Sequence, residues 1–432
     1  MPLLPLLAAF VAGIIAVRYL EGLAACWAAL SAALCVFGFV RGRFLTGGAG
    51  LFGLLGVTAI WLSMPEAPDF GDAMPGDYVG RVLEVADTPY NQRIVVEADC
   101  DGGRHSLLVY YHDVLPAVEA GDCVRFHGDL RPVGEGAVVP DEFSMNHFAF
   151  RRGIVAECHV GKGELNIVGH EVSVASFFAG MRRSLSDYIF SRSGLGPEAA
   201  GMLDAMLTGN ADAIGGERRD AFAGAGLAHV LALSGTHVAV IVFMVSMLFF
   251  PLRVAGRGRW ETFGILVVLW GYVLLTGCQP SVVRTVIMVS AVGCGRMLRR
   301  GSNSINNLCL AALLILVFDP RALFAPGFQM SFAAVAAILL FRFELFVGGK
   351  VAWWVRAAGN WLCVCVAAVV GTGALAAWHF HEVPLYFLLA NIPVGLLFPG
   401  FLGSGILLLV LQLTPVPAEW LVYVVEWLYA AI

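Results

Sequence analysis

The residues that could do chemistry in this sequence interrupt apolar stretches. Segment 222–243, FAGAGLAHVLALSGTHVAVIVF, carries His229, Ser234 and His237 among aliphatic side chains. Ser234 and His237 could form a nucleophile and base pair, or all three could line a pore or stabilise a helix break by hydrogen bonds. The Ser-Gly pair makes Gly235 the expected helix-break glycine. Polar groups at membrane depth need partners or a watery cavity, and broken helices there are buried in protein or line a cavity.

Arg284 is a second candidate, because it follows Pro280 and Ser281 near the start of an apolar span and lies outside the arginine-rich loops. We expect it either to contact an anionic group or to pin a broken helix to backbone carbonyls. The alternative is a side chain that snorkels to the outer interface. Polar residues of later spans could line a pore or join helices by hydrogen bonds. They are Gln329, Ser331 and Asn391.

An intramembrane enzyme is one alternative to a pore. His379, His381 and Glu382, in the stretch WHFHE, could supply metal ligands. The spacing differs from HExxH, which places two histidines on one helix face, and the Ser/His pair shows no third, orienting residue. We therefore expect no catalytic site, no metal and no cofactor. A small-solute transporter is a second alternative, but the internal repeats that would favour it are not evident.

The composition is typical of a membrane protein. Of 432 residues, 59% are hydrophobic and 14% are charged, whereas soluble domains carry about 25% charged residues. The 50 glycines suit close helix packing in lipid. These values exclude a soluble enzyme, a coiled coil and a disordered chain. The expected fold is a polytopic α-helical membrane protein with an inserted small all-β domain.

Hydrophobic spans lie on both sides of a more polar segment. Three precede it, near 2–17, 22–40 and 47–64, each close to the length that crosses about 30 Å of hydrocarbon. The first is marginal in length and could instead be one half of a hairpin. The first lacks a basic n-region, so we expect a membrane helix and not a cleavable signal peptide. Three shorter segments finish the chain after six further spans near 236–252, 260–277, 282–298, 303–318, 326–343 and 358–380.

Charge divides the chain in the same way. Residues 65–175 hold 19 acidic and 8 basic side chains, and the remainder holds 13 acidic and 19 basic. Counting crossings places four basic clusters on one side, which the positive-inside rule makes cytoplasmic, with Arg321 as an exception. The acidic domain then lies outside the cytoplasm. The clusters are Arg41/Arg43, Arg253/Arg257/Arg259, Arg296/Arg299/Arg300 and Arg342/Lys350/Arg356.

Within the acidic domain, β-rich runs at 78–85, 93–98, 106–112, 122–130 and 154–160 alternate with turn signals. With a short helix at 141–153, they predict an OB-like barrel, although other small β folds share this spacing. Its net negative charge should repel an anionic partner unless basic residues share a face. Candidates for that face are Arg125, Arg131, Arg151, Arg152 and Lys162. Cys100, Cys123 and Cys158 could include a disulfide or remain buried free thiols.

Segment 172–190 places apolar residues at helical spacing opposite Arg182, Arg183, Ser186 and Asp187. It predicts a helix in the membrane interface, the alternative being a core-facing helix of a larger soluble domain. The expected boundaries are N-terminal transmembrane helices at 1–64, the extracytoplasmic β domain at 65–171, interfacial and short or re-entrant helices at 172–235, and a transmembrane domain at 236–432.

Several motifs carry a family resemblance. AGLAHVLALSGTHVAVI (225–241) closely resembles the "aGL.HlLa.SG.H" signature of the ComEC family of bacterial competence proteins. LLTGCQPSVVRTVIM (274–288), FDPRALFAPGFQMSFAAV (318–335) and GTGALAAWHFHEVPLYFLLANIPV (371–394) resemble later motifs of that family. The resemblance covers nearly the whole chain, in order.

The resemblance implies a multi-pass channel in the bacterial inner membrane that conducts single-stranded DNA into the cytoplasm during natural transformation, with a competence-type channel domain at 236–432. Implied partners are single-stranded DNA, the bilayer, an extracytoplasmic DNA-delivery protein and a cytosolic motor or strand-binding protein, since no GxxxxGK[ST] site is present. Aromatic side chains can stack on unpaired bases, but their frequency is ordinary for membrane proteins, so none is assigned to DNA.

Longer family members carry a C-terminal metallo-β-lactamase-like domain thought to degrade the other strand. No HxHxDH run, which a two-metal nuclease needs, occurs in this sequence. We therefore expect no nuclease activity from this chain, as a natural short form or as a fragment of a longer protein.

Overall fold

The computed structural model divides into two compact units. The first consists of Met1–Leu7, Arg182–Ile315 and Pro326–Ile432, and the second of Ala8–Met181 and Leu316–Ala325. The structure describes residues 3–19, 21–63, 74–87, 92–100, 103–111, 118–133, 145–161, 163–210, 213–225, 227, 233–298, 303–341, 352–380 and 387–432.

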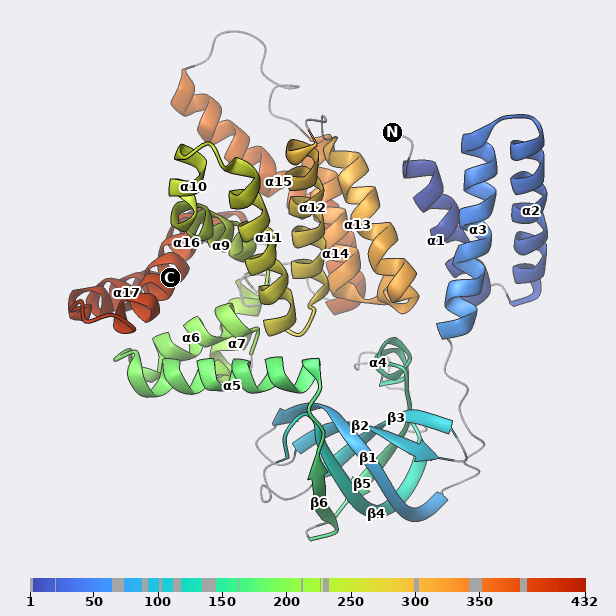
Figure 1. Cartoon of the computed structure of the whole chain (residues 1–432), viewed down its shortest axis with the longest axis horizontal. Coiled ribbons are helices and arrows are strands. Elements are labelled where there is room, and N and C mark those ends of the chain that lie inside the picture. The colour runs from blue at the N-terminus through green and yellow to red at the C-terminus, as the bar shows by residue number, and fades with distance from the viewer. Residues whose placement is uncertain are drawn as a thin grey trace. The chain divides into compact units, whose positions relative to one another are not determined.

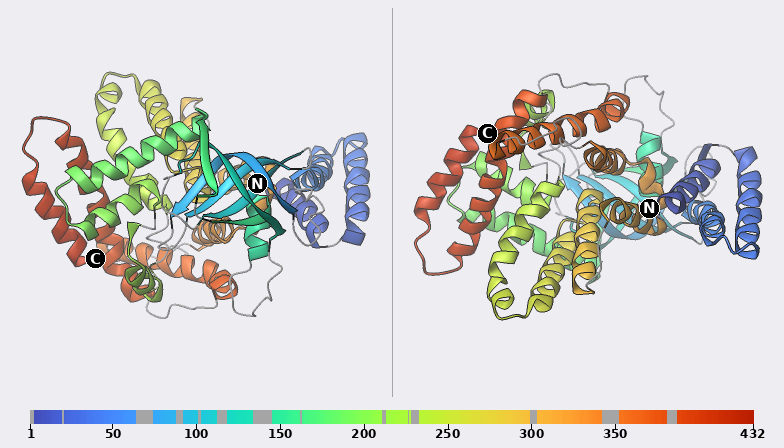
Figure 2. Two further views of the ribbon diagram at one scale, coloured as in Figure 1. Left: turned by 90° about the horizontal axis from the view of Figure 1, so that it is seen from below. Right: turned by 90° about the horizontal axis from the view of Figure 1, so that it is seen from above.

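A closed β-barrel belongs to the second unit (Figures 1 and 2). Its strands are β1 (Met74–Asp87), β2 (Gln92–Cys100), β3 (Gly103–Tyr111), β4 (Asp122–Pro132) and β5 (Ile154–Val160). The order β1-β2-β3-β5-β4 closes because β1 also pairs with β4, and β3 and β5 run parallel. The expected small OB-like domain is confirmed.

The long strand β1 closes the barrel by changing partners. Its first half pairs with β4, with Met74 opposite Leu130, and its second half pairs with β2, with Asp87 opposite Gln92. Gly80 belongs to both ladders, and a Cβ there would lie 2.7 Å from the Glu97 carbonyl oxygen. Glycine therefore permits the close backbone approach at this crossing.

Alternating side chains fill the barrel. On β2, Ile94, Val96 and Ala98 are buried, while the residues between them are partly exposed. Tyr111 and Phe126 are among the largest fully buried side chains of the chain. Because successive strand residues point to opposite faces, one face forms the core and the other carries the polar residues.

Helix α4 (Met145–Arg152) lies within the expected segment 141–153. A sixth strand, β6 (Leu165–His170), pairs with β4 and was not predicted. Only Leu165 of β6 is buried, so the strand lacks the alternation that identifies strands in sequence. All ten cysteines are free, and of the three in this domain Cys100 and Cys158 are buried, whereas Cys123 is partly exposed.

Three apolar helices precede the barrel: α1 (Leu3–Tyr19), α2 (Glu21–Val40) and α3 (Phe44–Ser63). Glycines recur every third residue at positions 47, 50, 53 and 56 of α3 and are buried. A Cβ at Gly50 would lie 2.5 Å from the Ser31 carbonyl oxygen of α2. Small residues at such positions allow helix backbones to approach closely.

The chain after the barrel is helical in its described part. Its elements are α5 (Val174–Arg192), α6 (Pro197–Thr208), α7 (Gly216–Gly224), α9 (Gly235–Leu248), α10 (Phe250–Val254), α11 (Gly258–Leu275), α12 (Pro280–Met297), α13 (Ser304–Phe318), the 3-10 helix η2 (Pro320–Phe324), α14 (Pro326–Leu340), α15 (Trp353–Phe380), α16 (Phe387–Gln412) and α17 (Glu419–Ala431).

Four helical segments in the described residues are long and apolar enough to cross a membrane. They are Phe44–Ser63, Gly258–Leu275, Trp353–Phe380 and Pro393–Gln412. Several shorter apolar helices accompany them, including α9, α13 and α14. The expected class, a helical membrane protein with an inserted β domain, is confirmed.

Two regions differ from the sequence expectation. In place of three short C-terminal segments, α16 runs for 26 residues through Pro393 and Pro399, and α17 follows. Prolines are tolerated in membrane helices because neighbouring groups can satisfy the freed carbonyls, so these prolines mark no helix end. In α5, Val174 and Phe177 are exposed, whereas Ile189 is fully buried in the core of the first unit. The first half of α5 thus presents unpacked apolar side chains, and in its second half Phe190 is also exposed.

Candidate functional site

Helix α9 begins at the Ser-Gly pair. Ser234 is the N-cap residue, in an extended conformation (φ −123°, ψ 172°). Its Oγ accepts a hydrogen bond from the Thr236 N–H at 3.3 Å, and its own N–H donates to His237 Nδ1 at 3.0 Å. This is a capping box with histidine at the position that usually carries Glu or Gln. Ser234 and His237 therefore hold the start of α9.

His237 is fully buried, and its ring meets Phe398 of α16 edge to face, with centroids 4.8 Å apart. Ser234 Oγ lies 2.9 Å from Nδ1, a distance that would suit a nucleophile and its base. However, Nδ1 also accepts the Ser234 main-chain N–H, so its single lone pair serves the cap. The geometry favours a helix-capping role over catalysis.

Arg284 lies beside the first residue of α9. Its side chain is 6% exposed; Nη1 donates to the Ser331 carbonyl oxygen of α14, and Nη2 donates to Thr285 Oγ1 at 3.4 Å. A Cβ added to Gly235 would lie 3.6 Å from Nη2. The guanidinium thus joins α12 to α14 through a backbone carbonyl and is enclosed by protein. This geometry agrees better with the expected role of pinning a helix through a backbone carbonyl than with snorkelling. The carbonyl belongs to a continuous helix, however, and not to a broken one.

A turn with positive φ angles sets the start of α12. Gly277 and Cys278 have φ values of 70° and 56°, and Pro280 is the first helical residue, a position that suits proline. The next residue of α12, Ser281, donates from Oγ to Ser331 Oγ at 3.2 Å. Positive φ is costly for cysteine, so packing around the turn must hold Cys278 in this conformation. The turn in turn fixes where α12 and its polar face begin.

Gln329 and His379 form a second polar contact. Gln329 Oε1 and His379 Nε2 lie 2.8 Å apart and join α14 to α15. These helices pack closely at Gly371, where a Cβ would lie 2.9 Å from the Ala333 carbonyl oxygen. His381 and Glu382, the other expected metal candidates, lie outside the described residues. Among those described, no group of three His, Cys, Asp or Glu side chains could hold a metal.

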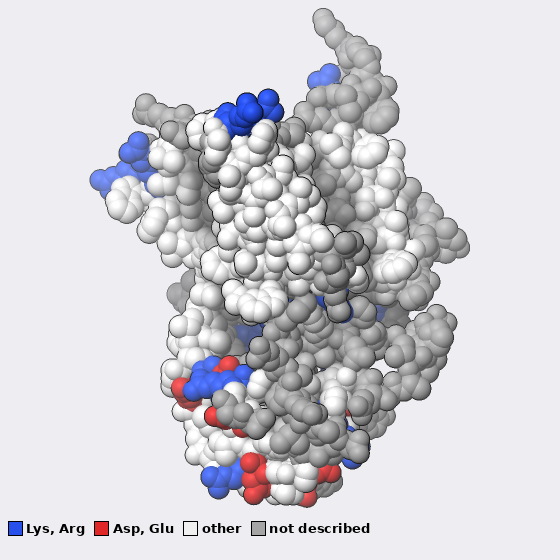
Figure 3. All heavy atoms as spheres, turned by 90° about the vertical axis from the view of Figure 1, so that its right-hand side faces the viewer, with Lys and Arg blue, Asp and Glu red and all other residues white. Residues whose placement is uncertain are grey.

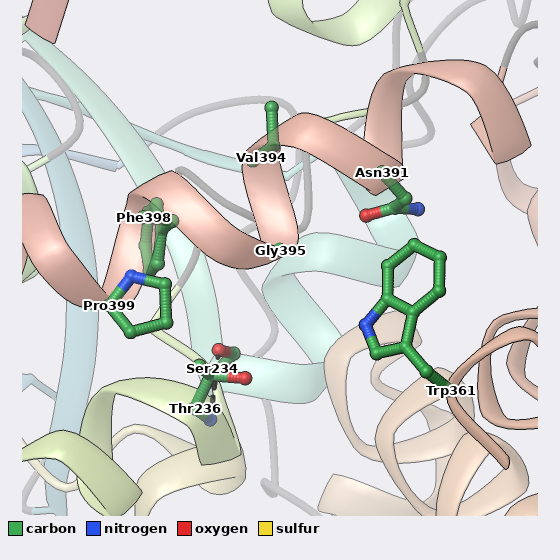
Figure 4. Close-up of a pocket in the computed structure, with 8 residues that line it drawn as sticks. All are labelled: Ser234, Thr236, Trp361, Asn391, Val394, Gly395, Phe398 and Pro399. Atoms are coloured by element: carbon green, nitrogen blue, oxygen red, sulfur yellow. Dashed lines mark hydrogen bonds between the residues drawn. The ribbon is translucent and has the colours of Figure 1, made fainter. Parts of the chain in front are cut away.

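A cavity of about 170 Å³ opens beside Ser234 (Figure 4). Asn391, at its rim, is 9% exposed. In Figure 4 the Asn391 amide lies beside the ring of Trp361, and Phe398 and Pro399 stand across the cavity from that ring. Helices α9, α15 and α16 therefore contribute one wall each. The lining residues are Ser234, Thr236, Trp361, Asn391, Val394, Gly395, Phe398 and Pro399.

Asp204, a buried carboxylate of α6, was not predicted. It is fully buried and accepts hydrogen bonds from Thr208 Oγ1 and Asn210 Nδ2, each at 3.2 Å. Burial raises the pKa of Asp204, while the hydrogen bonds, including one with Ser186, and the Arg182 charge act in the opposite direction. In the sequence, Asp204 could have been identified as the single aspartate in the apolar stretch PEAAGMLDAMLT.

The basic residues of the barrel are mixed with acidic ones. Arg152 pairs with Glu84 of β1, and Arg131 lies opposite Glu157 in the β4–β5 ladder. Arg125 projects outward from the middle of β4. In Figure 3 red and blue atoms lie side by side on the barrel, whereas the apolar helical surface shows blue only at its end. No uniform basic face is visible in that view.

The structure gathers part of the expected set. Ser234, Gly235, His237, Arg284 and Ser331 lie where α9, α12 and α14 meet, and we call these five residues the polar cluster. Asn391 reaches the cavity that Ser234 lines, and Gln329 pairs with His379. Arg151 is partly buried in α4. His229 and Lys162 lie outside the described residues. Trp361 lines the cavity but was assigned no role from the sequence.

These features define a membrane protein whose apolar helices enclose a polar cluster and a cavity, with a β-barrel inserted earlier in the chain. A sequence profile of the family described as "Competence protein" matches residues 206–432, which is more than half of the chain and includes the polar cluster. The chain belongs to the competence protein family.

Relatives agree with this assignment. ComE operon protein 3 of Bacillus subtilis is 28% identical over 302 residues, covering 68% of this chain and 37% of that protein. Competence protein ComA of Neisseria gonorrhoeae is 29% identical over 201 residues, covering 45% of this chain and 28% of that protein. An uncharacterized protein of Aquifex aeolicus is 30% identical over 186 residues, 43% of this chain and 42% of that protein. The chain thus spans less than half of each relative's length. No solved structure matches it.

Proposed function

We propose that this chain is a channel in the bacterial inner membrane that conducts single-stranded DNA into the cytoplasm. The observation that carries the proposal is the polar cluster around Arg284, which lies in the region matched by the competence family. Polar and charged side chains inside membrane proteins commonly mark substrate pathways. The family assignment makes DNA the substrate class to test.

The charge of Arg284 supports an anionic substrate. Its hydrogen-bond acceptors among the described residues, the Ser331 carbonyl and the Thr285 hydroxyl, are neutral. The N-terminus of α9 adds the positive end of a helix dipole beside it. Phosphates of a DNA strand are attracted by such a site, and carboxylates would repel them.

The barrel is proposed to lie outside the cytoplasm, and the basic loop clusters inside it. Arg41, Arg257 and Arg296 are exposed, as the positive-inside rule expects of cytoplasmic loops. Mixed charge on the barrel suits contact with a DNA-delivery protein better than tracking of the DNA backbone. A cytosolic motor or strand-binding protein would draw the strand inward, and no nuclease or other catalytic step is assigned to this chain.

The test is DNA uptake in a transformable host that lacks its own channel protein. DNA bound outside the cell and labelled strand in the cytoplasm are measured for the wild type, Arg284→Met and the exposed control Arg296→Met, at matched membrane levels. We expect cytoplasmic entry with the wild type and the control, and at least a tenfold loss with Arg284→Met. Binding without entry for a well-expressed wild-type chain would contradict the proposal.

A further inference from the structure

We propose that the cavity between α9, α15 and α16 binds one unpaired nucleobase of the moving strand, with Trp361 as the stacking surface and Asn391 as the hydrogen-bonding group for the base edge. This inference rests on the proposed function, because it names the part of the substrate that this cavity would hold. It assigns to the cavity a base contact, separate from the phosphate attraction of Arg284.

The size and walls of the cavity suit a flat ring. Its volume is about 170 Å³, whereas an apolar cavity of about 150 Å³ already binds benzene. Trp361 forms one wall, and Phe398 and Pro399 face it across the space (Figure 4). Gly395 keeps the α16 side flat, since a Cβ there would lie 3.3 Å from Trp361 Cζ2.

Two polar groups at the cavity have no hydrogen-bond partner among the residues that the structure describes. Neither the Asn391 amide nor the Trp361 indole N–H makes a hydrogen bond to another described residue, and Asn391 is 9% exposed. The Asn391 amide lines the cavity, so a group bound there can reach it. Asparagine offers both a donor and an acceptor, which is the combination that pairs with a nucleobase edge.

The same features fit other occupants less well. A lipid chain would leave the Asn391 amide unpaired, and a lone phosphate would gain nothing from the Trp361 ring. Ser234 and Thr236 place hydroxyls at the floor of the cavity, beside the N-terminus of α9, where the phosphate next to a bound base can lie. In this arrangement the ring of the base stacks on Trp361 and its edge bonds to Asn391. The neighbouring phosphate lies near the hydroxyls of Ser234 and Thr236.

The test compares two fluorescent 12-nucleotide strands, oligo(dT) and an abasic strand of equal length and charge. Both are titrated against the purified full chain in lipid nanodiscs at one salt concentration. Because base stacking on an aromatic ring contributes about 1–3 kcal/mol, the wild type should bind oligo(dT) about 5- to 140-fold more tightly than the abasic strand.

The variants assign this preference to the cavity. Trp361→Ala should reduce it to near unity by weakening oligo(dT) alone, and Trp361→Phe should retain part of it. Asn391→Leu, of similar volume, should weaken oligo(dT) about 2- to 12-fold, the effect of one lost neutral hydrogen bond. Trp354→Ala is the matched control, because Trp354 lies on the same helix and is 62% exposed.

Abasic-strand binding reports whether each variant is folded. Equal affinity of the wild type for the two strands would overturn the base site and leave the channel proposal standing. An unchanged preference for oligo(dT) in both Trp361→Ala and Asn391→Leu would have the same meaning. Failure of the wild type to bind either strand would overturn both proposals. Loss of preference in the two cavity variants, with the control unchanged, supports the base site.

Discussion

The β-barrel and the helical region 233–432 distribute polarity in opposite ways. In the barrel, Tyr111 and Phe126 are fully buried, and ionic groups such as Arg81 and Glu97 pair on the surface at 3.2 Å. In the helical region, Trp378 and Val370 are exposed, whereas Arg284, His237 and Asn391 are buried. The first pattern belongs to a domain in water and the second to helices in lipid.

The difference shows where function can be sought. The apolar core and the paired surface charges of the barrel are explained by folding alone. Polar side chains inside helices that face lipid are expensive, so each must have a partner or a task. Arg284 and His237 have protein partners, and Asn391 lines a cavity. The polar cluster and this cavity are therefore the candidates for the DNA path.

The largest effect is expected in the barrel core. Phe126→Ala removes a fully buried ring that lies 5.7 Å from the Tyr78 ring, centroid to centroid, and should cost about 3–5 kcal/mol. The opening equilibrium of the barrel should rise about 140- to 4,000-fold, measured by hydrogen exchange of the full chain. Val79→Ala, at an exposed position on β1, is the control. Equal effects of the two variants would mean that the barrel core does not stabilise the domain.

Cysteine reactivity should show the same core. Burial raises the pKa of Cys158 to about 11, so its thiolate fraction at about pH 8 should be roughly 200-fold lower than in an unfolded chain with a thiol pKa of about 8.5. Alkylation should therefore be slow in the native protein and fast in urea. Because the folded pKa is the higher one, stabilisation by the neutral thiol is complete below about pH 8.5 and is lost as pH rises to about 11. Fast native alkylation at pH 8 would contradict burial.

The stability of the helical region should depend on a buried charge, whereas that of the barrel depends on a buried ring. Arg284→Met removes hydrogen bonds made by a charged group, which contribute about 1.5–3 kcal/mol, or about 10- to 140-fold in an equilibrium constant. Thermal unfolding of the full chain in detergent should shift downward, while hydrogen exchange of the barrel stays unchanged. Arg296→Met is exposed and should shift neither. A more stable Arg284→Met chain would show that the buried charge serves transport alone.

A smaller effect is expected at the start of α9. Ser234→Ala removes the N-cap oxygen and should cost about 0.5–2 kcal/mol, whereas Ser234→Thr keeps a hydroxyl and should restore most of it. Ser246→Ala, on the exposed side of the same helix, is the control. Hydrogen exchange in the first turn of α9 reports the change. An unaltered first turn in Ser234→Ala would mean that the cap is not formed.

The smallest effect is expected at Gly235. A Cβ there would lie 3.4 Å from Thr285 Oγ1 and 3.6 Å from Arg284 Nη2, both ordinary contacts. Gly235→Ala should therefore change the thermal midpoint by no more than the scatter between preparations, and uptake should persist. Loss of uptake in a chain of normal stability would show that the glycine is needed in a second conformation of the helix start.

Much of the fold was predictable, because its signals are local. Hydrophobic length identified three of the four segments that are long and apolar enough to cross a membrane, Phe44–Ser63, Gly258–Leu275 and Trp353–Phe380. Period-two alternation identified β1–β5. Strand β6 lacked that alternation, and α16 continued through two prolines because helix ends in lipid depend on neighbouring helices.

The site was predictable in part. Ser234, His237 and Arg284 stood out as polar residues in apolar segments, and the structure places them together. Trp361 did not stand out, since an aromatic residue in an apolar helix is ordinary, and only the fold brings it to Asn391. Asp204 was overlooked because its partners, including Ser186 from another helix, become visible only in three dimensions.

The central claim is that the strand passes the polar cluster and cavity and not the lipid-facing surface. A photo-crosslinking amino acid at Thr236, which lines the cavity, can be compared with one at Phe243, which is 59% exposed on the same helix. During uptake of labelled DNA, we predict label on the chain substituted at Thr236 and none on the chain substituted at Phe243. Uptake that proceeds with no label at Thr236, or with equal label at both positions, would contradict the account.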